Sequence, residues 1–112
     1  MGSAAQLIDE CHQALVYLIP VLDRLPKPRR NSLAQQLEQH MLKLLVLLSQ
    51  AMYAAERKLL LEQANQELIA IRHLWRLCYE LKLINADRYG YFCEFLQSVG
   101  LQLGGWLKHA KR

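Results

Sequence analysis

The chain has 112 residues, of which 53% are hydrophobic and 21% charged, with 14 lysines and arginines against 10 aspartates and glutamates. This length predicts one domain over residues 1–112, and the hydrophobic content excludes a disordered chain. The net charge of +4 permits a polyanionic partner without requiring one. The apolar content slightly exceeds what a lone domain of this size needs, which favours self-association.

The cysteines and the uncharged stretches indicate the cellular compartment. Cys11, Cys78 and Cys93 are an odd number at wide spacing, so they fit neither a disulfide framework nor a redox pair. We therefore expect a reducing, cytoplasmic environment. The first twelve residues include two acidic side chains and no basic run, which does not fit a signal peptide. Uncharged stretches such as 44–55 are far shorter than the roughly 20 residues of a membrane span, so we expect no membrane association.

The first half of the sequence predicts two helices. Apolar residues at three- and four-residue spacing predict a helix over 3–25, with a kink at Pro20. Pro26 and Pro28 are expected to impose extended backbone on the residues that precede them. A second helix is predicted over 32–54, where Ser32 and Gln35 have the spacing of a capping box.

The second half predicts two more helices. Residues 56–83 contain a continuous apolar stripe (Leu60, Ala64, Leu68, Ile71, Trp75, Cys78, Leu81). Asn85 or Asp87 can cap the last helix, which extends to about His109. We therefore expect an all-α fold, an antiparallel up-down four-helix bundle with short loops.

This topology predicts where the basic side chains gather. The first and third loops share one end of the bundle, and the second loop shares the other end with the C-terminus. The first group is Arg24, Lys27, Arg29, Arg30, Lys82 and Arg88, and the second is Arg57, Lys58, Lys108, Lys111 and Arg112. Charge clusters such as Lys27/Arg29/Arg30 and Lys108/Lys111/Arg112 can bind phosphates with steep salt dependence. The alternative is a solvated loop and a solvated tail.

Arg72 and Arg76 lie one helical turn apart and present two guanidinium groups, which suit phosphate or carboxylate. The alternative is pairing with neighbours, since Glu80 follows Arg76 by four residues. The predicted binding residues for nucleic acid or a protein partner are Arg24, Lys27, Arg29, Arg30, Arg72, Arg76, Lys108, Lys111 and Arg112.

Two features predict an oligomer interface. Five consecutive apolar residues, 44–48, cover the whole circumference of a helix, although one core can bury only one face. Gly100 and Gly104 form a G-x-x-x-G pair, and such glycines cost about 1 kcal/mol each in a helix unless a close contact compensates. Trp106 adds a large apolar anchor. The predicted interface residues are Leu44, Leu45, Leu47, Leu48, Gly100, Gly104 and Trp106.

Catalytic and metal-binding patterns are missing from the sequence. The four histidines form neither an H-x-x-x-H pair nor the E-x-x-H spacing of di-iron bundles. Cys78 and Cys93 lie in apolar stretches, Cys11 and the adjacent His12 point in directions about 100° apart on a helix, and no glycine-rich phosphate loop occurs. We predict no catalytic residue, no metal ligand and no cofactor, and therefore no enzymatic activity.

Three motifs resemble the accessory variability determinant (Avd) family of diversity-generating retroelements. They are Leu25-Pro26-Lys27-x-x-Arg30, Ile71-Arg72-His73-Leu74-Trp75-Arg76-Leu77 and Leu103-Gly104-Gly105-Trp106-Leu107-Lys108. Their order and spacing cover nearly the whole chain. One stretch departs from the family pattern, because Ser98-Val99-Gly100-Leu101 lacks the acidic residue and the arginine usual there.

The resemblance implies a four-helix bundle that assembles as a homopentameric barrel with a basic surface, encoded by a prokaryote or a phage. It also implies a non-enzymatic protein that binds the retroelement's reverse transcriptase and RNA or DNA, and supports mutagenic retrohoming. By position, Lys27 and Arg30 match the family's basic loop, Arg72 and Arg76 its third-helix strip, and Lys108 its tail. The alternative is an oligomeric helical-bundle scaffold with no nucleic-acid role.

Overall fold

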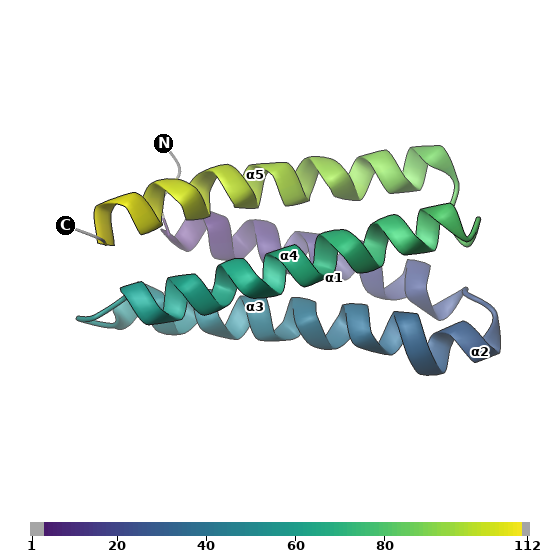
Figure 1. Cartoon of the computed structure of the whole chain (residues 1–112), viewed down its shortest axis with the longest axis horizontal. Coiled ribbons are helices and arrows are strands. Elements are labelled where there is room, and N and C mark those ends of the chain that lie inside the picture. Colours follow the sequence, from purple (N-terminus) through teal and green to yellow (C-terminus); the bar gives the residue numbers. More distant parts are fainter. Residues whose placement is uncertain (1–3, 111–112) are drawn as a thin grey trace.

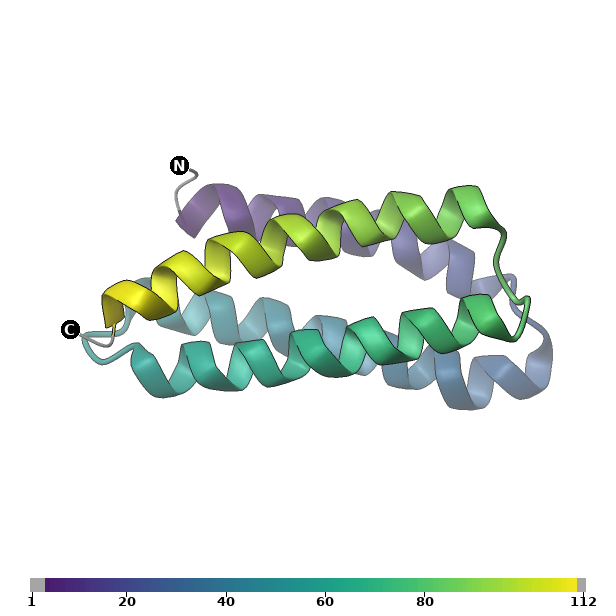
Figure 2. The same ribbon diagram turned by 45° about the horizontal axis from the view of Figure 1, so that its top comes forward.

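The computed structural model describes residues 4–110, which form an elongated helical bundle measuring 45 × 24 × 20 Å (Figure 1). The elements are α1 (Ala4–Asp23), α2 (Lys27–Arg29), the π-helical turn η1 (Arg30–Ala34), α3 (Gln35–Tyr53), α4 (Lys58–Glu80) and α5 (Ala86–Ala110). The four long helices alternate in direction, as the sequence predicted. Figure 2 shows α1 and α5 in one layer above α3 and α4. Each long helix therefore packs against two neighbours.

The connection between α1 and α3 differs from the prediction. Pro26 is extended, with ψ 144°, but Lys27 already begins a helix that continues through η1 into α3. Pro28 is tolerated because amides in a first helical turn have no intrahelical acceptor to lose. The predicted capping box is therefore wrong: Ser32 lies inside η1, where its hydroxyl donates to the Pro28 carbonyl over 2.9 Å.

The turn between α4 and α5 is built by two helix-capping motifs. The Leu83 amide donates to the Cys78 carbonyl and the Lys82 amide to the Tyr79 carbonyl, both over 2.9 Å. This is a Schellman motif with Lys82 at φ 62°, a left-handed conformation that usually favours glycine. The Asn85 side chain then accepts the Arg88 amide over 2.8 Å, which confirms Asn85 as the cap of α5.

One hydrophobic cluster runs through the bundle between its two layers. Trp75 of α4 is fully buried, lies edge-on to Phe92 of α5, and donates its indole N–H to the Tyr89 carbonyl over 3.0 Å. The apolar stripe predicted for α4 is wrong at both of its ends. Leu61 rather than Leu60 is buried, and Leu81 is exposed. No polar or charged residue of the described chain is buried.

Polar side-chain contacts link two pairs of helices, α3 with α4 and α1 with α5. His40 Nδ1 of α3 lies 2.6 Å from Glu67 Oε1 of α4. Between α1 and α5, the Glu10 carboxylate accepts hydrogen bonds from Ser98 Oγ at 2.9 Å and from Gln102 Nε2 at 3.1 Å. Ser98 therefore has a partner within the chain.

Candidate nucleic-acid and partner interface

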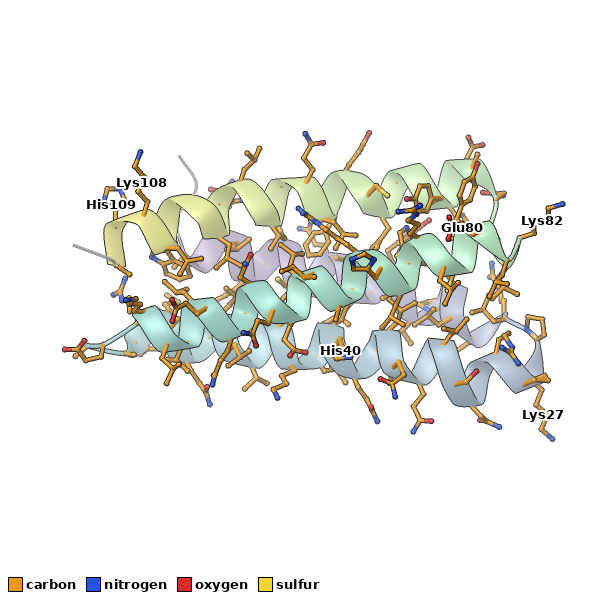
Figure 3. All side chains as sticks on the ribbon, in the orientation of Figure 1. Lys27, His40, Glu80, Lys82, Lys108 and His109 are labelled. Carbon is orange, nitrogen blue, oxygen red and sulfur yellow. The ribbon has the colours of Figure 1, made fainter. Side chains whose placement is uncertain are left out.

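The fold brings together the basic residues of the first and third loops. Lys27 and Lys82 point away from the bundle at one end, whereas Lys108 lies near the other end (Figure 3). The short helix α2 carries Lys27 and Arg29, and the Schellman turn carries Lys82. Within residues 4–110, no ion pair or side-chain hydrogen bond engages Arg24, Lys27, Arg29 or Lys82. Their charges are therefore available to a partner.

Arg30 and Arg88 are more closely tied to the bundle than their neighbours. Arg30 Nη1 lies 3.5 Å from the Asp23 carbonyl oxygen, and both residues line a small cavity that also includes Glu38. Burial raises the pKa of Tyr17 of α1, and the positive charge of Arg88 partly offsets this rise. We predicted from the sequence that Arg88 and Lys82 lie at this end, but we predicted a binding role for neither residue.

Arg72 is engaged by α5. Its Nη2 donates to the Leu96 carbonyl over 3.3 Å and occupies the space where a side chain at residue 100 would begin. The same guanidinium lines a cavity of about 240 Å³ together with Tyr89, Cys93 and Gln97. Gly100 is thus explained within one chain, because its missing Cβ makes room for Arg72.

Arg76 is paired on the surface of α4. Its Nε lies 3.2 Å from Glu80 Oε2, and the two side chains are 64% and 53% exposed. The predicted alternative of local pairing therefore holds for Arg76. An exposed pair of this kind contributes only about 0–1 kcal/mol, so an acidic partner can displace Glu80 at little cost.

Among the described residues, the opposite end offers fewer unpaired cations, namely Lys58 and Lys108. Arg57 donates to the Ala54 carbonyl over 3.2 Å, and its guanidinium carbon lies 5.8 Å from the centre of the Trp106 ring. Lys108 is exposed. The predicted binding residues Lys111 and Arg112 lie outside the described residues.

The predicted oligomer interface is divided between the core and the surface. Leu44, Leu47 and Leu48 are buried within the single chain, and Leu45 is half-buried. The exposed member of the apolar run is Val46, at 52%, which shares the outer side of α3 with Leu42 and Tyr53. Trp106 is half-buried.

The glycines of α5 differ in their surroundings. Added Cβ atoms at Gly104 and Gly90 would meet nothing within 4 Å. No contact within the described chain therefore accounts for a glycine at position 104, in contrast to position 100. Leu101, which lies between Gly100 and Gly104, is 74% exposed.

The titratable groups of the described chain do not form a metal cluster or a reactive-thiol site. No group of three or more His, Cys, Asp or Glu residues is placed to hold a metal ion within residues 4–110. Burial raises the pKa of Cys11 to about 12, with a further contribution from Glu10, and raises that of Cys78 to about 11. Both thiols behave as buried apolar groups. None of the described helices is long and apolar enough to cross a membrane.

Comparison with known proteins places the chain in a family. A sequence profile described as bAvd-like matches residues 6–110, which is almost all of the bundle. No curated protein matches the chain.

Proposed function

Because this chain belongs to the bAvd-like family, we propose that it is a non-enzymatic accessory protein of a diversity-generating retroelement. It binds the reverse transcriptase and nucleic acid during mutagenic copying and retrohoming, in the cytoplasm of a prokaryotic cell. The observation that carries this proposal is the family match over residues 6–110. The three motifs quoted above support it, since all three lie within the matched region.

Self-association, as a homopentamer by family resemblance, is part of this proposal. Leu42, Val46 and Tyr53 support it because three large apolar side chains are exposed along one side of α3. Exposed apolar side chains that share one side of a helix can pack against a second copy of the chain. Gly104 adds a position where a second helix can approach closely, because nothing lies within 4 Å of the place its Cβ would occupy.

The reverse transcriptase is proposed to contact the strip formed by Arg72 and Arg76. Both residues are exposed on α4, and Arg76 is held only by a surface ion pair. A carboxylate of the polymerase can replace Glu80 with bidentate hydrogen bonds to the guanidinium.

A pull-down tests this function. The wild-type protein should retain reverse transcriptase, whereas a variant with Arg72→Glu and Arg76→Glu should lose it while keeping its helical circular dichroism. A matched variant with Lys43→Glu and Lys58→Glu changes the charge equally on exposed lysines and should retain the enzyme. Retention by the arginine variant would remove these residues from the contact, and failure of the wild type to bind would overturn the proposal.

The alternative, an oligomeric scaffold without a nucleic-acid role, makes a different prediction. It associates with protein partners but shows no affinity for RNA at low salt. Titration of the protein with RNA at two salt concentrations separates the two functions, because phosphate contacts weaken steeply as salt rises.

A further inference from the structure

The charge of the described chain is distributed unequally along the bundle. The two segments 23–30 and 82–88 lie at the same end of the bundle, which we call the α2 end, and contain six basic residues against two acidic ones. The other residues of 4–110 contain six basic residues against eight acidic ones. The balances are +4 and −2, so positive charge is concentrated at the α2 end.

The conformation of Lys82 makes this end unusual. Within the described chain, Lys82 is the non-glycine residue whose φ is positive. It occupies the position of the Schellman motif that is usually taken by glycine. A lysine there is strained, and its side chain makes no ion pair or hydrogen bond within residues 4–110. Strain retained without a compensating contact points to a function of the side chain.

The three described arginines outside the α2 end are engaged by other groups of the chain, whereas Lys43, Lys58 and Lys108 are exposed on three different helices. Arg72 is held against the Leu96 carbonyl, Arg76 is paired with Glu80, and Arg57 is held over Trp106. At the α2 end, by contrast, Arg24, Lys27, Arg29 and Lys82 have no acidic partner. Lys27 and Lys82 come from different loops and both project from the end of the bundle (Figure 3).

We propose that the α2 end is the nucleic-acid-binding surface, and that the phosphate backbone of single-stranded RNA contacts Lys27 and Lys82 together with Arg24 and Arg29. This inference rests on the proposed function and adds a location to it. With the RNA at the α2 end, the exposed Arg72/Arg76 strip on α4 stays available to the polymerase. Phosphate contacts of this kind do not depend on base sequence.

The test is binding of a fluorescein-labelled single-stranded RNA oligonucleotide, followed by fluorescence anisotropy over a range of salt concentrations. The end variant carries Lys27→Gln and Lys82→Gln, and the control variant carries Lys43→Gln and Lys58→Gln, which are exposed lysines outside the α2 end. Both lose the same formal charge. The end variant should show a slope of log affinity against log salt that is shallower by about 1.4, since each lost phosphate contact removes about 0.7.

The variant Lys82→Gly distinguishes a loss of RNA binding from a loss of folding stability. It should melt at a higher temperature than the wild type, because glycine relieves the left-handed strain, and yet bind RNA more weakly, with a slope shallower by about 0.7. A general loss of fold cannot produce this combination.

Each outcome decides between defined alternatives. If the end and control variants bind RNA equally, the location is wrong and the proposed function stands. If the wild type fails to bind RNA even at low salt, the nucleic-acid role and this inference both fail. If the end variant binds RNA normally but loses the reverse transcriptase, the α2 end is a protein-binding surface and the inference is overturned.

Discussion

The guanidinium of Arg72 occupies the space that a side chain at residue 100 would need. Its Nη2 donates to the Leu96 carbonyl over 3.3 Å, and an added Cβ at Gly100 would contact that same nitrogen. The glycine on α5 and the arginine on α4 thus form one packing unit. This relationship gives Gly100 a role inside the single chain.

Substituting Gly100 tests this packing unit. Gly100→Ala gains about 1 kcal/mol of helix propensity but displaces the Arg72 tip from the Leu96 carbonyl, so the free energy of unfolding should change little. In an Arg72→Ala background the same substitution should stabilise by about 1 kcal/mol. Urea unfolding of the four proteins measures the coupling, and equal effects of Gly100→Ala in both backgrounds would show that the two residues are independent.

Gly104 tests the proposed oligomer interface. Gly104→Ala and Gly90→Ala both add a methyl group to open surface of α5, so each should stabilise the helix by about 1 kcal/mol. Only Gly104→Ala should weaken the assembly, because a Cβ there keeps a second helix at a greater distance. Sedimentation velocity measures the assembly, and unchanged association of Gly104→Ala would remove this residue from the interface.

The pair His40–Glu67 should matter more for stability than the pair Arg76–Glu80. The side chains of His40 and Glu67 are 30% and 15% exposed, whereas the second pair is mostly exposed. His40→Ala leaves the Glu67 carboxylate without its partner between α3 and α4, which should cost about 1–3 kcal/mol. Arg76→Ala should cost less than about 1 kcal/mol. Thermal unfolding compares the two variants, and equal destabilisation would contradict this ranking.

The buried thiols predict a loss of stability at high pH. Burial raises the pKa of Cys11 to about 12 and of Cys78 to about 11, both from an ordinary value of 9.0. Above pH 9.0 the unfolded thiols lose protons that the folded ones keep, so this contribution to stability is complete below pH 9.0 and declines as pH rises towards 11 and 12. The decline reaches up to about 1.4 kcal/mol per pH unit for each thiol.

Chemical unfolding between pH 8 and pH 11 measures this decline against the variant Cys11→Ala/Cys78→Ala, which should lose less stability over the same range. An identical pH profile for the two proteins would contradict the assignment. Cys93 is only half-buried and provides an internal comparison, since it should be alkylated at pH 8 before Cys11 and Cys78.

Periodicity and turn residues predicted the four helices and their order, because each long helix has a clear apolar stripe and Asn85 marks the start of α5. The first connection was mispredicted. Pro28 was expected to exclude helix from Lys27, but a proline in the first turn loses no hydrogen bond. Sequence spacing therefore located the helices better than their ends.

The candidate site was predictable only in part. Topology alone brings Lys27 and Lys82 to one end. The left-handed conformation of Lys82 has no signature in the sequence, because glycine is the residue that usually announces it. The contact of Arg72 with Gly100 depends on the alignment of α4 against α5, which helical periodicity does not define. The burial of Leu44, Leu47 and Leu48 similarly depends on how α3 turns towards the core.

Native mass spectrometry of the purified protein mixed with the reverse transcriptase tests the central claim most directly. The account predicts a complex that contains the polymerase and five copies of the 13.0 kDa chain. Free polymerase beside a 13.0 kDa monomer would contradict both the assembly and the accessory function.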